Sequence, residues 1–420
     1  MKQKPPSLTD SGHDWIGKIP SHWSLTRVGQ AFRQRSTKVS DRDFPALSVT
    51  KMGILPQLEH VAKTDDNDNR KLVKAGDFVI NSRSDRKGSS GIAEIDGSVS
   101  LINTVLKITG NIYPAYCHHL MRSSAFQEEF YRMGNGLVAD LWSTNFSAMK
   151  GINLPQPPLE EQTAIANFLD RETARIDSLI EKKGRFIELL NEKEKTAISH
   201  FVRLGVDRSA ELADSGIEWR GKVPAHWEVG RMKNHFRQVK RQGFQSLTVL
   251  SVYREFGVIE KSSRDDNINK TPEDLSKYQL VEPNDLAINK MKAWQGSMGV
   301  SNLCGITSPD YVVMKPVGNH NPRYMHHYLR ARPMPWVYRL ISNGIRTDQW
   351  RMEPEKFLEL PIFLPPKTEQ QIIANRIDRE LEHIRSLIAT TQRSIELLKE
   401  KRLALITAAV TGKIDLRNAA

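Results

Sequence analysis

The chain has 420 residues, of which 39% are hydrophobic and 26% charged, so it is long enough to form two or three folded domains. Its two cysteines exclude a disulfide framework and a zinc site built from CxxC pairs. The apolar runs are too short to span a bilayer and the N-terminus lacks an apolar signal core, so we expect a cytoplasmic protein with no membrane partner. A net charge of +12 favours a polyanionic partner, although solvated basic faces are also common.

The first feature in chain order is a segment that occurs twice. GHDWIGKIPSHW at residues 12–23 returns as GIEWRGKVPAHW at residues 216–227, which is 204 positions later. Further matches follow at a spacing of 208, among them Asp77 with Asp285 and His118-His119 with His326-His327. The change from 204 to 208 lies near residues 271–278. The sequence therefore consists of two copies of one unit of a little over 200 residues.

The first part of each copy, residues 1–156 and 208–363, carries short runs rich in β-branched and aromatic residues. These runs include FPALSVT, DFVINS and LINTVLKIT in copy one, and SLTVLSVY, DLAIN and DYVVMK in copy two. Glycine, asparagine, aspartate and proline turns separate them. Each of these parts is predicted to be a mixed α/β globule.

The second part of each copy, residues 157–207 and 364–420, starts at a Pro-Pro pair and continues as a long helical pattern. Proline gives the helix a preset start, and Glu160, Glu161 and Glu369 suit the positive end of a helix dipole. The apolar stripe with 3,4 spacing includes Ile165, Leu169, Ile176, Leu179, Phe186 and Leu190 in copy one, and Ile373, Ile377, Leu381, Ile384, Ile395 and Leu405 in copy two. Such a stripe predicts a partner helix, and about 45 residues would form a rod of roughly 65 Å.

Tryptophan and histidine dominate the remaining motifs. Trp15, Trp23, Trp219 and Trp227 are interpreted as packing anchors that dock the start of each globule, with the helical rod as one possible surface. The adjacent histidines of each pair would point about 100° apart on a helix, so they cannot chelate one metal ion together. We expect neither a metal nor a cofactor.

Two motifs each occur twice: WxGxxPxHW at 15–23 and 219–227, and PP-(x)2-3-EQ at 157–162 and 365–370. With these motifs the chain resembles the specificity subunits of Type I restriction-modification systems over essentially its whole length. The resemblance implies an α+β fold with an internal pseudo-twofold repeat. In it, two mixed α/β target-recognition domains are separated by two long antiparallel helices that form a coiled-coil spacer.

The same resemblance implies a non-catalytic subunit that binds double-stranded DNA with a split recognition sequence. It would direct methyltransferase subunits, expected to be two, and restriction and translocation subunits to that DNA. The residues exclude a stand-alone adenine methyltransferase, because the Pro-Pro pairs follow Gln156 and Leu364 and form no active-site tetrapeptide. A bipartite DNA-binding or regulatory protein without restriction partners stays open as the alternative.

Base-reading residues are expected where the two copies diverge in polar loops. After a matched Ile-Asn, copy one reads SRSDRKGSSG and copy two reads KMKAWQGSMG. Basic and amide side chains in such loops can contact base edges or phosphates. The candidate DNA-binding residues are Lys51, Arg83, Arg86, Lys87, Ser89, Asn135 and Asn145 in copy one, and Arg254, Lys290, Lys292, Trp294, Gln295, Asn343, Arg346 and Gln349 in copy two.

Overall fold

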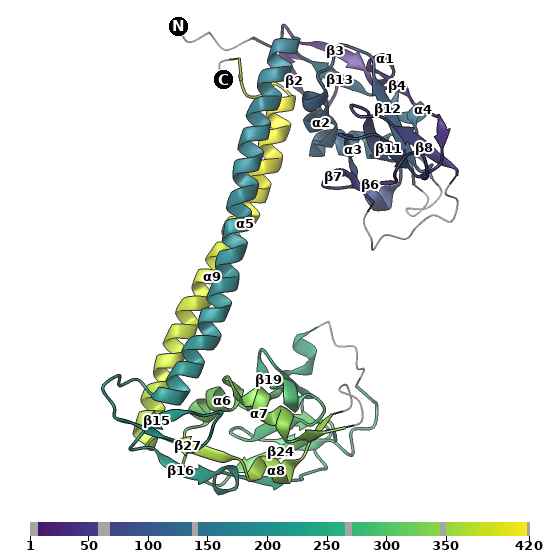
Figure 1. Cartoon of the computed structure of the whole chain (residues 1–420). Coiled ribbons are helices and arrows are strands. Elements are labelled where there is room, and N and C mark those ends of the chain that lie inside the picture. Colours follow the sequence, from purple (N-terminus) through teal and green to yellow (C-terminus); the bar gives the residue numbers. More distant parts are fainter. Residues whose placement is uncertain (1–6, 58–67, 137–141, 265–270, 345–349, 418–420) are drawn as a thin grey trace. The chain divides into compact units, whose positions relative to one another are not determined.

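The computed structural model describes residues 7–57, 68–136, 142–264, 271–344 and 350–417 (Figure 1). The chain divides into two compact units. Unit 1 comprises Met1–Lys183 with Gln392–Ala420, and unit 2 comprises Gly184–Thr391. Each unit contains one globule and one half of each of two long helices. Among the described residues, every helix is either too short or too polar to traverse a lipid bilayer.

The globule of unit 1 is built on an antiparallel four-stranded sheet in the order β10-β9-β12-β4. Its strands are β4 (Phe32–Gln34), β9 (Phe78–Asn81), β10 (Ser90–Ile92) and β12 (Asn103–Ile108). A three-stranded sheet joins β5 (Lys38–Val39), β8 (Arg70–Val73) and β11 (Gly97–Val99), and β6 (Leu47–Thr50) pairs with β7 (Gly53–Pro56). All four residues of β9 are buried, as expected for a central strand with both faces covered.

Helices α2 (Pro114–Arg122) and α3 (Ser124–Arg132) cover this sheet and complete its core. The core combines Phe32, Phe78 and Leu106 from the sheet with Tyr116 and Phe126 from the helices. Pro114 starts α2, where its missing N–H costs nothing. Ser123 ends α2 and begins α3, because its hydroxyl accepts a hydrogen bond from the Phe126 N–H at 3.2 Å. The short elements are β1 (Leu8–Asp10), β2 (Lys18–Pro20), β3 (Ser24–Arg27), β13 (Asn153–Gln156), α1 (Val28–Ala31) and α4 (Phe146–Met149).

The globule of unit 2 repeats this plan. Its four-stranded sheet has the order β17-β24-β21-β22, from β17 (Phe236–Val239), β21 (Leu286–Asn289), β22 (Met298–Val300) and β24 (Tyr311–Pro316). The other strands are β14 (Leu212–Asp214), β15 (Lys222–Pro224), β16 (Glu228–Arg231), β18 (Leu250–Tyr253), β19 (Gly257–Glu260), β20 (Gln279–Val281), β23 (Gly305–Thr307), β25 (Ser342–Asn343), β26 (Arg351–Met352) and β27 (Pro361–Leu364). The helices are α6 (Pro322–Arg330), α7 (Met334–Leu340) and α8 (Pro354–Leu358). Strands and helices recur at the spacing found in the sequence, which confirms the internal repeat.

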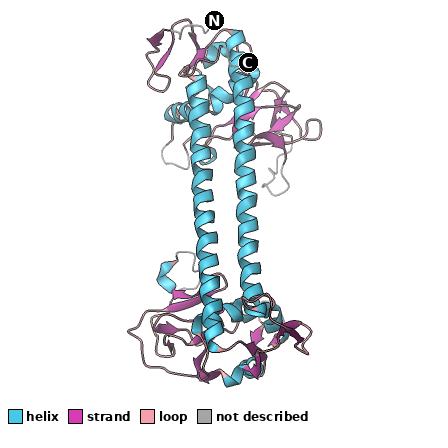
Figure 2. Cartoon of the chain, turned by 90° about the vertical axis from the view of Figure 1, so that its left-hand side faces the viewer, coloured by secondary structure: helices cyan, strands magenta, loops and turns pink. Residues whose placement is uncertain are grey.

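The long helices are α5 (Leu159–Leu204) and α9 (Lys367–Val410), of 46 and 44 residues. They run antiparallel within each unit, where their halves lie side by side (Figure 2). In unit 1, Ile165 and Leu169 share a core with Val410, and Arg402 Nε lies 3.0 Å from Asp177. In unit 2, Val202 shares a core with Ile373, Ile377 and Leu381, and Lys193 Nζ lies 3.2 Å from Glu380. The expected mixed globules and the long antiparallel helices are confirmed.

Two residues of the expected apolar stripe on α5 were assigned wrongly. Leu179 and Phe186 are exposed, at 38% and 44% of their surface. Ile180 and Ile187, one position further along, are half-buried instead. The stripe continues from Ile176 through these two residues to Leu190, because four-residue steps as well as three-residue steps keep a helix face in register.

The repeated Trp-Pro-His-Trp segment docks against the start of a long helix in each unit. In unit 1, Glu161 at the N-terminus of α5 accepts hydrogen bonds from Trp23 Nε1 at 2.8 Å and pairs with His22 Nε2 at 2.6 Å. In unit 2, Glu369 accepts from Trp227 Nε1 at 3.3 Å and pairs with His226 Nε2 at 2.8 Å. The interpretation of Trp23 and Trp227 as packing anchors is therefore confirmed.

The glutamine that follows each of these glutamates joins the helix start to the globule. The Gln162 amide oxygen accepts from the Tyr113 N–H at 2.7 Å, and its Nε2 donates to the Pro157 carbonyl at 2.8 Å. Gln370 makes the same two bonds to Asn321 at 2.8 Å and Pro365 at 2.9 Å. The PP-EQ motif is thus a structural joint, in which glutamate holds the tryptophan and buried glutamine holds the loop before α2 or α6.

Candidate nucleic-acid interface

The loops that follow β9 and β21 have the same backbone frame. Loop 1 is Ser82–Gly88 and loop 2 is Lys290–Gly296. Each is preceded by an asparagine, the last residue of the strand, whose Oδ1 accepts a local backbone N–H: Asn81 from Arg83 at 3.0 Å, and Asn289 from Met291 at 3.1 Å. Each contains a 3-10 turn, Ser84–Arg86 in loop 1 and Ala293–Gln295 in loop 2. Each ends in a glycine in the left-handed region, with φ of 83° at Gly88 and 91° at Gly296.

A short extended segment supports each loop from the side. In unit 1 the Thr144 N–H donates to the Ser82 carbonyl at 2.9 Å, and Ser143 forms antiparallel bridges with Arg83 and Asn135. In unit 2 the Met352 N–H donates to the Lys290 carbonyl at 3.1 Å, and Arg351 pairs with Asn343 in the β25–β26 ladder. Asn135 and Asn343 are both exposed. We call the loop together with this segment the loop platform.

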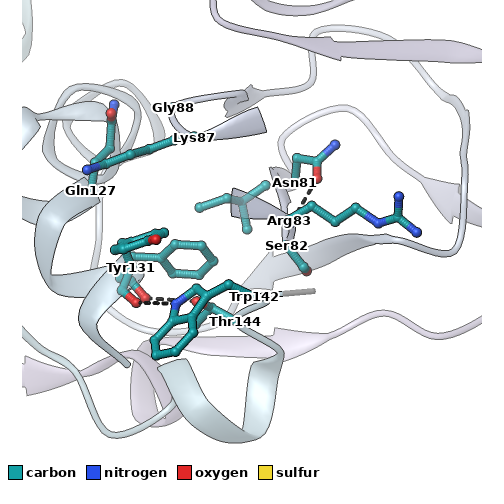
Figure 3. A pocket seen from close by; sticks show the side chains of 11 residues that line it. Asn81, Ser82, Arg83, Lys87, Gly88, Gln127, Tyr131, Trp142 and Thr144 are labelled. Atoms are coloured by element: carbon teal, nitrogen blue, oxygen red, sulfur yellow. Dashed lines mark hydrogen bonds between the residues drawn. The ribbon is translucent and has the colours of Figure 1, made fainter. Parts of the chain in front are cut away.

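In unit 1 an aromatic cluster lies beneath the loop platform (Figure 3). It lines a shallow pocket of ≈ 330 Å³, open mouth included. Trp142 Nε1 donates to the Tyr131 carbonyl at 2.9 Å, and the two rings are 5.8 Å apart between centroids. The Lys87 ammonium lies 5.0 Å above the Tyr131 ring and 2.6 Å from Glu128. Lys87 is therefore held against the protein surface by these two contacts, and its charge is paired.

Arg83 behaves differently from Lys87. Its guanidinium is exposed, points away from Tyr131 and Trp142 (Figure 3), and has no hydrogen-bond or ion-pair partner among the described residues. Of the other candidates on loop 1, Arg86 is 3.5 Å from Asp85, and Ser89 just beyond the loop is only 5% exposed. Arg83 is thus the cation on loop 1 that is most available to an outside anion.

In unit 2 a different set of side chains occupies the same frame. Trp294 Nε1 donates to the Met291 carbonyl at 3.0 Å and packs edge-on against Trp350 at 5.8 Å between centroids. Arg339 lies 5.1 Å above the Trp350 ring. Lys292 is exposed and Lys290 half-exposed, and within the part of the chain that the structure describes neither ammonium has a partner. Gln295 is half-buried.

Lys51 and Arg254 lie in the turns of the β6–β7 and β18–β19 hairpins. Their backbone carbonyls accept hydrogen bonds from an arginine on the neighbouring helix: Arg122 for Lys51, and Arg330 at 2.6 Å for Arg254. The Lys51 side chain is exposed, whereas Arg254 Nη2 lies 3.3 Å from Glu255. The two turns are therefore anchored in the same way while their side chains differ.

The paired histidines participate in this anchoring. Arg122 donates to His118 Nε2 at 2.6 Å, and Arg330 donates to His326 Nε2 at 3.3 Å. Burial, and secondarily the adjacent arginine, lowers the pKa of both His118 and His326 to about 3. Their neighbours turn to the long helices, where His119 lies 2.7 Å from Asp170 and His327 lies 3.0 Å from Asp378. No group of three or more potential metal ligands occurs among the described residues.

The remaining candidates divide into two groups. Asn145 caps α4, because its Oδ1 accepts the Ala148 N–H at 3.0 Å, and Asn343 Nδ2 donates to Glu353. These amides support the fold. Arg346 and Gln349 lie outside the described residues.

The sequence reasoning missed three residues of the platforms: Trp142, Trp350 and Arg351. Trp142 and Trp350 stand 208 positions apart, the same spacing that aligned the Pro-Pro and His-His pairs. That spacing was sufficient to find them. Arg351 has no such signal, because its counterpart 208 positions earlier is Ser143.

Comparisons with known proteins agree with this arrangement. No family model matches the chain. It is 23% identical over 437 residues to the putative type I restriction enzyme MjaX specificity subunit of Methanocaldococcus jannaschii, with 96% of each chain covered. It is 27% identical over 445 residues to the MjaVIII specificity subunit of the same organism, with 96% of this chain and 95% of the relative covered.

Solved structures share the fold. The crystal structure of the HsdS subunit from Thermoanaerobacter tengcongensis matches with a TM-score of 0.56 at 17% identity, covering 97% of this chain and 100% of that one. A chain from a structure of a type I R-M system matches with a TM-score of 0.68 at 14% identity, covering 94% and 99%. In its repeated halves, its two long helices and its whole-length matches, the chain is similar to specificity subunits of type I restriction-modification systems.

Proposed function

We propose that this chain is the DNA-recognition subunit of a type I restriction-modification complex. It binds a double-stranded target in two separated parts and directs methyltransferase and restriction subunits to that site, and it performs no catalysis itself. The recognition domains are residues 1–156 and 208–363, and residues 157–207 and 364–420 supply the long helices. The internal repeat supports the binding of two methyltransferase subunits, one for each copy of the repeated unit.

The observation that carries this proposal is that loops 1 and 2 share a backbone frame and differ in their side chains. Loop 1 offers the guanidinium of Arg83, and loop 2 offers the ammonium groups of Lys290 and Lys292. Arginine can bind guanine O6 and N7 with two hydrogen bonds, whereas lysine acts as a point charge towards a base or a phosphate. Two frames that present different donors are suited to reading two different half-sites.

The side-chain contacts also support a ranking of the candidate DNA-binding residues. Lys51, Arg83, Lys290 and Lys292 are without side-chain partners in the described part of the chain, and we assign them to contacts with DNA. Lys87, Trp294 and Asn145 are held by internal contacts, so they shape the surface rather than read it. Asn135 is exposed on the loop platform and remains a candidate for base contact.

Coexpression with a methyltransferase subunit tests the function. The purified complex should methylate adenine within a motif made of two specific parts and an unspecified gap, and sequencing of methylated DNA would detect it. Methylation by this chain alone, or a continuous motif, would contradict the proposal. A chain that binds a split target but does not copurify with methyltransferase subunits would favour the alternative, a bipartite DNA-binding regulator.

A further inference from the structure

Each loop platform has a pair of matched positions, one on the loop and one on the supporting segment, and the arginine of the pair lies on the loop in unit 1 and on the supporting segment in unit 2. In unit 1 the pair is Arg83 on loop 1 and Ser143 on the supporting segment. In unit 2 the residues 208 positions later are Met291 on loop 2 and Arg351 on β26. One residue of each pair is therefore arginine and the other is uncharged.

Contacts in unit 2 bring Arg351 onto the same surface as loop 2. Arg351 Nε lies 3.0 Å from Met291 Sδ, and the next residue donates its N–H to the Lys290 carbonyl. The Arg351 side chain is exposed, and within the described residues its two terminal nitrogens have no hydrogen-bond partner. A guanidinium held at Nε keeps Nη1 and Nη2 free, which are the two donors that an end-on contact with a guanine edge needs.

The position of Arg351 is fixed by backbone pairing rather than by a flexible loop. Arg351 and Met352 pair with Asn343 and Ser342 across the β25–β26 ladder. Met352 is 1% exposed and holds the strand against the core. A donor on a paired strand is better preorganised than one on a free loop, and preorganisation favours discrimination between bases.

We propose that Arg351 is a specificity-determining residue of unit 2 and the functional counterpart of Arg83 in unit 1. It reads a base edge in the half-site bound by unit 2, beside Lys290 and Lys292. This inference rests on the proposed function, because it presumes that unit 2 binds one half of a split target.

The test is Arg351→Ser, which installs the residue found at the same position in unit 1. The variant is examined in the complex with its methyltransferase partner by sequencing methylated DNA and by titrating duplexes that differ at single base pairs. Discrimination at one base pair of one half-site should fall roughly 5- to 150-fold, and the other half-site should be unchanged. Arg351→Lys should lose most of this discrimination as well, since an ammonium cannot donate the two parallel hydrogen bonds that a guanidinium donates to a guanine edge.

Arg208→Ser, an exposed arginine of unit 2 outside the loop platform, is the matched control and should leave the motif unchanged. Equal weakening on all sequences after Arg351→Ser, with recovery by Arg351→Lys, would show a phosphate contact and overturn the inference. An unchanged motif would overturn it too. Failure of the proposed function is distinguishable, because then the wild-type complex would methylate no bipartite motif.

Discussion

Units 1 and 2 agree in the residues that build the loop platform and differ in the residues that it displays. Asn81, Gly88 and Trp142 recur as Asn289, Gly296 and Trp350, and they supply the turn, the left-handed end and the aromatic support. The cations do not recur. We infer that repetition in this chain marks structural positions, and that the base-reading positions are those where the repeat fails.

The largest effect is expected at the aromatic support, where the two units also differ. Trp142→Ala should lower the stability of loop 1 by about 2 to 3 kcal/mol, because it removes ring packing and a hydrogen bond to the Tyr131 carbonyl. Trp350→Ala should cost less, since among the described residues its Nε1 has no acceptor. Hydrogen–deuterium exchange resolved by peptide measures both, with Trp142→Phe as the intermediate control. Equal losses of loop stability after Trp142→Ala and Trp350→Ala would contradict the predicted difference between the units.

A second prediction tests what the units share. Glu161→Ala and Glu369→Ala should each destabilise their own unit by about 1 to 2 kcal/mol, because each leaves a buried tryptophan N–H without its acceptor. Gln at either position keeps an oxygen acceptor and should restore most of the loss. Denaturant unfolding measures the change, and Glu160→Ala, an exposed neighbour on α5, serves as the control. A loss confined to one unit would break the proposed equivalence of the two joints.

Acidification should lower the stability of both units through the matching histidines His118 and His326. The pKa of His118 and of His326 is about 3 in the folded chain, against an ordinary value near 6.5 in the unfolded chain. Between these values the unfolded chain binds more protons, so stability falls as pH falls through this window. From pH 7 to pH 5.5 each histidine should contribute a loss of about 1 kcal/mol.

Thermal unfolding at the two pH values measures this loss. His118→Gln and His326→Gln should each make the unfolding less sensitive to pH, whereas His383→Gln, an exposed histidine on α9, should not. Undiminished pH sensitivity in both test variants would show that other groups control acid stability.

The smallest effect is expected at the β6–β7 turn. Lys51→Ala should weaken binding about equally on all sequences and reduce the slope of log affinity against log salt by about 1, because an exposed lysine on a helix-anchored turn is suited to a phosphate. Titration of one duplex at several salt concentrations measures the slope. A change in the recognised letters, with an unchanged slope, would place Lys51 at a base edge instead.

The sequence predicted most of the architecture because the repeat is explicit. Glycine, tryptophan, proline and histidine at fixed spacing identified the joints, and the 3,4 pattern identified α5 and α9. The periodicity could not decide between Leu179 and Ile180, since either residue continues an apolar stripe. That choice depends on the packing of the partner helix.

The candidate site was less predictable, because availability of a charge depends on neighbours distant in sequence. Lys87 and Arg83 look alike in the sequence, yet Glu128 and Tyr131 on α3 hold Lys87, whereas the Arg83 side chain has no partner among the residues that the structure describes. Arg351 was missed for a related reason. Its side chain contacts Met291, which lies 60 positions earlier in the sequence, and no local pattern marks that contact.

The central claim is that each unit reads its own half-site with the cations of its own loop. Sequencing of methylated DNA from complexes that carry Arg83→Ala with Arg86→Ala, or Lys290→Ala with Lys292→Ala, tests it most directly. We predict that the first pair changes one half of the motif, that the second pair changes the other half, and that the combined variant shows both changes together. Changes in both halves from either pair alone, or in neither half from any variant, would contradict the account.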